Sequence, residues 1–168
     1  SEFGKTSTNN LNSQLGLRRG LIDFVQTYKV LTTEQAQRLR ELTLKANQTE
    51  ADKAEIEKIK ADVMASDKKR SELSQKQNLT DADRSVLSDY SNRVQTMGAV
   101  LDRWNAEFTD ELNTLEGQAR QTTVDRAKAS LQEVAKSQGF TMVYEATVAP
   151  YGANDLTEDT IKSMNAKR

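Results

Sequence analysis

Side chains that could carry out acid-base chemistry are mostly carboxylates in this chain, and few of them are grouped. The sequence has 25 Asp and Glu residues, no His and no Cys, which excludes imidazole bases, thiol nucleophiles and the usual zinc ligand sets. Asp110 with Glu111, and Glu158 with Asp159, could each supply an acid and a base. Adjacent helical residues point apart, however, and nothing desolvates these pairs. We interpret them as surface and capping charges, and expect no enzyme, no cofactor and no metal.

The overall charge and composition narrow the classes of partner. The 168 residues carry a formal net charge of −1, with acids and bases interspersed, so a large basic surface for nucleic acid is not expected. No apolar run approaches the length needed to span a membrane. Hydrophobic residues make up 36% of the chain and aromatic residues 5%, a balance that favours extended helices over a thick core. We therefore expect part of the core to come from self-association.

The longest predicted element is a helix over residues 80–139, interrupted only by Gly98 and Gly117. Its large apolar residues follow steps of three and four, which is the seam of a coiled coil. Two successive steps of four near Phe108 then shift the heptad phase. We expect the seam to pack against another arm of the chain, with burial of Trp104 and Phe108 preferred over contact with a ligand. The seam consists of Leu87, Tyr90, Val94, Met97, Leu101, Trp104 and Phe108.

A second predicted helix precedes it, over residues 32–76. Thr32 and Gln35 have the spacing of a capping box at its start. Its apolar stripe is thin, and we expect the middle of this helix to be mobile. The short break near 74–80 predicts an antiparallel hairpin, so residues 32–138 form an arm with its tip there. Lys68, Lys69 and Arg70 lie near the tip, either as a solvated face or as a contact for a bound polypeptide.

The two ends of the chain carry strand patterns. Residues 1–16 are polar and without periodicity, which predicts a flexible segment. Residues 17–24 and 140–145 indicate strands, 146–151 a second short strand, and Gly139 ends the long helix. The sequence thus predicts an α+β, mostly α fold, in which 17–31 and 139–168 form a small β-rich oligomerisation body. The residues expected in that body are Ile22, Phe24, Phe140, Met142, Tyr144 and Val148.

The tail of the chain carries a resemblance to a known family. Glu133–Glu145, Val148, Tyr151 and Asp155–Asn165 resemble the C-terminal signature of the Skp, or OmpH-like, family of periplasmic chaperones. Gly20–Phe24 is similar to the first strand of that family. With the helical arm between them, the resemblance covers nearly the whole chain.

This resemblance implies a homotrimer shaped like a jellyfish, whose arms surround a cavity. It also implies an ATP-independent holdase that binds unfolded outer-membrane or exported proteins in the periplasm. Any signal peptide is expected to lie outside the printed residues. Well-known members are strongly basic, whereas this chain is nearly neutral, so electrostatic steering should be weak. The lipopolysaccharide contact proposed for the family has no residue match here, so neither it nor a membrane-surface contact is carried over.

An alternative interpretation belongs to a different class of protein. The chain could be a structural coiled-coil protein that contacts other helices or the cell envelope and holds no unfolded clients. That alternative predicts exposed seams and no protection of a client from aggregation. The sequence leaves both interpretations open.

Overall fold

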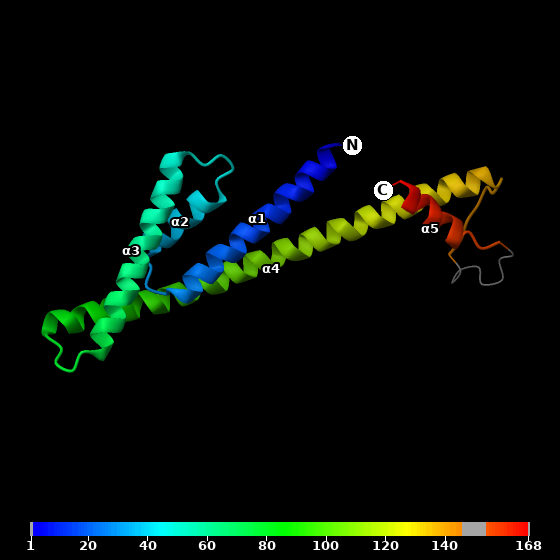
Figure 1. Ribbon diagram of the computed structural model, residues 1–168. Coiled ribbons are helices and arrows are strands. Elements are labelled where there is room, and N and C mark those ends of the chain that lie inside the picture. Colours follow the sequence, from blue (N-terminus) through cyan, green and yellow to red (C-terminus); the bar gives the residue numbers. More distant parts are fainter. Residues whose placement is uncertain (1, 146–153, 168) are drawn as a thin grey trace. The chain divides into compact units, whose positions relative to one another are not determined.

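The structure, a computed structural model, describes residues 2–145 and 154–167 of the chain. Within these ranges it contains helices and no strand (Figure 1). The predicted α+β class, with a β body built from both chain ends, is therefore wrong for the described part of the chain. The helices are α1 (Glu2–Thr27), α2 (Thr33–Leu44), α3 (Glu50–Gln75), α4 (Asp81–Ser137) and α5 (Thr157–Ala166).

The strand predicted over residues 17–24 is the second half of α1, a helix that also includes most of the segment expected to be flexible. The apolar run is too short to separate a strand from a helix by periodicity alone. When the window is lengthened by one turn, the burial pattern is that of a helix. Three of its residues are buried and two are partly buried; these are Leu21, Ile22 and Val25, and then Phe24 and Tyr28. These residues form one stripe that faces the core.

The strand predicted over residues 140–145 is non-helical chain that follows α4, and its residues 141–145 are exposed. Gly139 ends α4 as predicted, with a positive φ of 78°. Its N–H donates to the Lys136 carbonyl, and the Phe140 N–H donates to the Ala135 carbonyl at 2.8 Å, which is the Schellman pattern. A strand needs a partner, and the expected partner at the other end of the chain is helical. The predicted strand at 146–151 lies outside the described residues.

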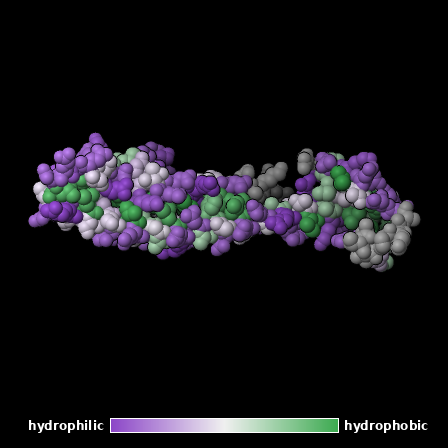
Figure 2. All heavy atoms as spheres, turned by 90° about the horizontal axis from the view of Figure 1, so that it is seen from below, coloured by the Kyte–Doolittle hydropathy of each residue, from purple (hydrophilic) through white to green (hydrophobic). Residues whose placement is uncertain are grey.

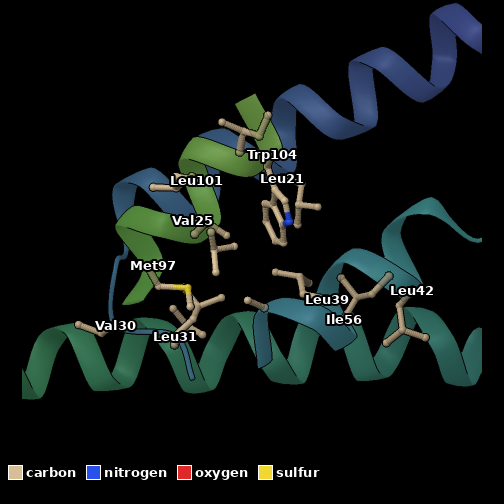
Figure 3. Close-up of a cluster of buried hydrophobic side chains, with 14 of the residues drawn as sticks. Leu21, Val25, Val30, Leu31, Leu39, Leu42, Ile56, Met97, Leu101 and Trp104 are labelled. Atoms are coloured by element: carbon tan, nitrogen blue, oxygen red, sulfur yellow. The ribbon is translucent and has the colours of Figure 1, made fainter. Parts of the chain in front are cut away.

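The structure divides into two compact units within α4, at Leu112 and Asn113. Unit 1 comprises residues 1–112 and holds the main hydrophobic core. Side chains from α1, α2, α3 and the first part of α4 point toward one another there (Figure 3). The extended linker between α1 and α2 adds Val30 and Leu31, both fully buried. Unit 1 is therefore a packed helical domain in its own right.

Within unit 1, α1 lies antiparallel beside α4 (Figure 1). Arg18 and Glu111 form an ion pair, with Arg18 Nε 3.0 Å from Glu111 Oε2. Closer to the core, the guanidinium of Arg19 lies 5.9 Å from the centre of the Phe108 ring. Charged groups thus border the apolar contact between the two helices.

The helix predicted over 32–76 is broken into α2 and α3 by a turn at residues 45–49. The capping box of Thr32 and Gln35 is confirmed at the start of α2. A second capping box, formed by Thr49 and Asp52, begins α3. Strong local caps explain why this stretch turns where a mobile but continuous helix was expected.

The turns at the two ends of α3 share one sequence pattern, Leu-x-x-Lys-x-Asn-x-Thr-x-Ala-Asp, from Leu42 to Asp52 and from Leu73 to Asp83. In each copy the Lys N–H closes the preceding helix by donating to the Leu carbonyl. Thr and Asp then exchange hydrogen bonds of 2.9 to 3.1 Å at the start of the following helix. The Lys ammonium also binds the Asp carboxylate, at 2.7 Å in the first copy and 2.6 Å in the second. We call these two segments the Lys–Asp corners.

Unit 2 comprises residues 113–168 and, in its described part, has little core. The buried residues there are Ser130, Ala135 and Leu156. Helix α5 is tied to the end of α4 by polar contacts: Arg126 donates to the Met164 carbonyl, Gln138 donates to Asp159, and Lys167 pairs with Glu133. Such exposed contacts add little stability.

Candidate binding surface

The predicted seam of the long helix lies largely inside unit 1. Tyr90, Met97, Leu101 and Trp104 are buried. Leu87, Val94 and Phe108 are partly buried. These positions make the seam part of the core rather than a surface that a ligand could reach.

Trp104 shows how the seam is covered. It lines a small recess with Leu21 and Ile22 of α1 and with Arg40 of α2, and 5% of its surface is exposed. The Arg40 guanidinium lies 5.3 Å from the centre of the indole, and Arg40 also pairs with Glu107 one turn further along α4. Figure 3 shows the indole directed toward Leu39.

The residues predicted for an oligomerisation body fall into both units. Ile22 is buried and Phe24 partly buried in the core of unit 1. Phe140, Met142 and Tyr144 belong to unit 2, where Met142 and Tyr144 are 65% and 56% exposed. The sixth residue, Val148, lies outside the described residues.

The predicted basic contact near the tip of the arm lies on α3. Lys68 and Lys69 are exposed. Arg70 instead donates to Asp67 one turn away, at 2.9 Å. The structure therefore presents two solvated lysines and one paired arginine at this position.

Large apolar side chains are exposed mainly in unit 2. Figure 2 shows hydrophobic residues interspersed with hydrophilic ones on the face in view. In α4 no side chain between residues 113 and 129 is buried. Sequence reasoning did not single out Val124, which is off the seam, or Val143, which alternates with the strand residues Met142 and Tyr144 that were chosen for the body. The exposed large apolar residues of unit 2 are Val124, Met142, Val143, Tyr144 and Ile161, hereafter the unit 2 apolar residues.

The carboxyl groups with shifted pKa values lie at helix caps and in ion pairs. In the first Lys–Asp corner, hydrogen bonding to Lys45 and then to Thr49 lowers the pKa of Asp52 to about 2. Lys76 and Thr80 lower the pKa of Asp83 to about 2 in the same way. Arg38 lowers the pKa of Glu55, to which it donates twice, at 2.7 and 2.8 Å. These shifts favour charged carboxylates and indicate structural ion pairs rather than acid-base catalysts.

Two further properties of the described residues bear on the kind of site. No described helix is long and apolar enough to cross a membrane. Nor does the described part bring three or more acidic side chains together in a way that could hold a metal ion. The exposed apolar side chains of unit 2 are therefore the feature on which a functional proposal can be built.

Comparison with known proteins gives no relative for this chain. No protein-family model, no curated protein and no solved structure matches it.

Proposed function

We propose that this protein is an ATP-independent holdase, acting in the periplasm, that binds unfolded outer-membrane or exported proteins and keeps them from aggregating. One observation carries the proposal. The unit 2 apolar residues are exposed although the described part of that unit buries only three residues. Exposed apolar side chains that lie together mark interaction sites, and Met142, Val143 and Tyr144 are consecutive in the chain.

The chemistry of the unit 2 apolar residues suits a partner without fixed structure. Met142 has a flexible, polarisable side chain that adapts to different surfaces. Tyr144 presents an apolar ring with a polar tip. Many weak contacts of this kind retain an unfolded chain through avidity, and they need no nucleotide. Binding only the unfolded state is sufficient for a holdase.

One further feature supports the same proposal. The tail resembles the C-terminal signature of the Skp family, whose members are holdases. The net charge of −1 departs from the strongly basic members of that family, so long-range steering of clients should be weak. We also propose that the protein self-associates as a homotrimer, which would multiply the contacts available to one client.

The test is suppression of aggregation. An unfolded outer-membrane protein is diluted from denaturant and its light scattering is followed with and without this protein. We expect the wild type to suppress scattering and the double variant Met142→Ser, Tyr144→Ser to suppress it several-fold less. Met64→Ser is the matched control, since Met64 is 44% exposed but lies on α3 in unit 1. Equal activity of the double variant, or no suppression by the wild type, would contradict the proposal.

A structural role is the second candidate, and one observation favours it. The seam of α4 continues beyond unit 1 with Leu115, Leu131 and Val134, each only partly buried. Partly buried positions of this kind suit a partner helix. A structural coiled-coil protein would form oligomers through this region and would leave the aggregation of an unfolded client unchanged.

A further inference from the structure

Unit 2 contains a groove between the end of α4 and the chain that follows it. Its volume is about 360 Å³, within the usual range for ligand sites. The Schellman turn at Gly139 produces it, because this turn sends Phe140 to Val143 back along the last turns of α4. The residues that line it are Lys128, Leu131, Gln132, Ala135, Lys136, Phe140, Thr141, Met142 and Val143.

The helical side of the groove has two distinct rows. Leu131 and Ala135, four residues apart, form an apolar row that continues into Phe140. Lys128, Gln132 and Lys136 form a polar row beside it, also at intervals of four. The groove is thus apolar along its base and cationic along one side.

The two lysines of the groove are unpaired in the described part of the chain. No described acidic residue lines the groove. Neither Lys128 nor Lys136 makes an ion pair with the described residues. By contrast, Lys167 of the same unit pairs with Glu133. The cationic side of the groove is therefore available to a ligand that brings its own carboxylates.

We propose that this groove binds an extended segment of the unfolded client that carries two acidic side chains, four residues apart, with apolar residues between them. The spacing follows from geometry. Lys128 and Lys136 lie two helical turns apart, about 12 Å along α4, and four residues of extended chain span about 13 Å. The apolar residues between the acids would contact Leu131, Phe140 and Met142. This inference rests on the proposed holdase function and names the class of segment that it recognises.

The probe is a fluorescently labelled peptide with the core Glu-Val-Leu-Val-Glu, titrated with the full chain at low salt and followed by anisotropy. The matched peptide replaces both Glu residues with Gln, which keeps size and hydrogen bonding but removes charge. Two exposed ion pairs together account for about a fivefold difference in affinity. We expect the Glu peptide to bind about fivefold more tightly, and this preference to fade at high salt.

The protein variants test where binding takes place. The double variant Lys128→Glu, Lys136→Glu should bind the Glu peptide at least fivefold more weakly than the wild type does. It should also no longer prefer the Glu peptide to the Gln peptide. Lys162→Glu on α5 is the control, since Lys162 is exposed in the same unit but does not line the groove. Circular dichroism establishes that all variants keep their helices. Because the comparison of peptides uses the wild type, the proposal is testable even if a variant fails to fold.

Four outcomes would overturn one claim or the other. Equal binding of the two peptides, or equal loss with Lys162→Glu, would overturn the groove as a site for acidic segments. Suppression of aggregation that is unchanged by the Lys128 and Lys136 substitutions would also overturn it, while leaving the holdase function in place. Peptide binding without any suppression of aggregation would overturn the holdase function instead.

Discussion

At the scale of single residues, Asp52 and Asp83 perform the same task in the two Lys–Asp corners. Each carboxylate accepts a backbone hydrogen bond at a helix start and binds the Lys that ends the preceding helix. A negative charge at a helix N-terminus is also favoured by the helix dipole. The three interactions require the charged form of the carboxylate, which is why its pKa is low.

The low pKa of Asp52 predicts a defined dependence of stability on pH. Its pKa falls from an ordinary 3.8 to about 2 in the folded protein. The stabilisation is therefore fully present above about pH 4 and is lost as the pH falls toward 2. We compare the melting temperatures of the wild type and Asp52→Asn, and expect a difference that is largest above pH 5, shrinks as the pH falls toward 2 and disappears only below it.

The control for this prediction is Asp62→Asn on α3. Asp62 is exposed and forms neither a cap nor an ion pair. The melting temperature of Asp62→Asn should equal that of the wild type at every pH. A difference between the wild type and Asp52→Asn that stays constant from pH 5 to pH 2 would show that the carboxylate does not act through its charge.

Leu39 provides a test of the core of unit 1. Leu39 lies on α2 and is fully buried in the core. Leu39→Ala should therefore lower the free energy of unfolding by about 2 to 5 kcal/mol. Leu112→Ala, at a position that is 37% exposed, should cost less than about 1 kcal/mol. Urea denaturation followed by circular dichroism measures both variants. Similar costs at the two positions would mean that the described core does not form.

At the scale of elements, the corners should act independently because they lie at opposite ends of α3 (Figure 1). Removing one Thr cap costs about 1 kcal/mol. Thr49→Ala and Thr80→Ala should therefore each destabilise unit 1 by about that amount, and the double variant by about 2 kcal/mol. Thr33→Ala, one residue after the cap of α2, should change the stability by less than about 0.5 kcal/mol. Strong non-additivity in the double variant would show that the two corners are coupled.

The elements show which parts of the fold could be predicted from the sequence. The long helix was predicted over 80–139 and is found at Asp81–Ser137, because its apolar spacing and its cap are both local signals. The capping box of Thr32 and Gln35 could be predicted for the same reason, because it depends only on residues close together in the sequence. The repeated corner pattern was equally visible in the sequence, with Lys, Thr and Asp at fixed spacing, but it was not recognised.

The ends of the chain could not be predicted by the same reasoning. A short apolar run such as Leu21 to Phe24 fits a strand or a helix, and only the partners of its side chains decide between them. Residues 140–145 have the composition of a strand, yet pairing depends on another segment that composition does not reveal. The groove in unit 2 was missed for a related reason, since it depends on the direction in which the chain leaves Gly139.

At the scale of the whole molecule, the two units differ in how much they bury. Helix α4 belongs to both. Five of its residues between 90 and 104 lie in the core of unit 1, whereas no residue between 113 and 129 is fully buried. Amide hydrogen exchange should reflect this difference. In the protein alone, we expect residues 113–129 to exchange at least tenfold faster than residues 90–104. Equal protection of the two segments would mean that unit 2 is covered in solution even without a client.

The central claim is that the protein holds unfolded clients, and native mass by light scattering tests it most directly. The mass is measured for the protein alone and after an unfolded outer-membrane protein is diluted into it from denaturant. The holdase proposal predicts an oligomer, and with the client a soluble complex of larger defined mass. A protein whose mass does not change while the client precipitates would contradict the proposal and favour the structural role.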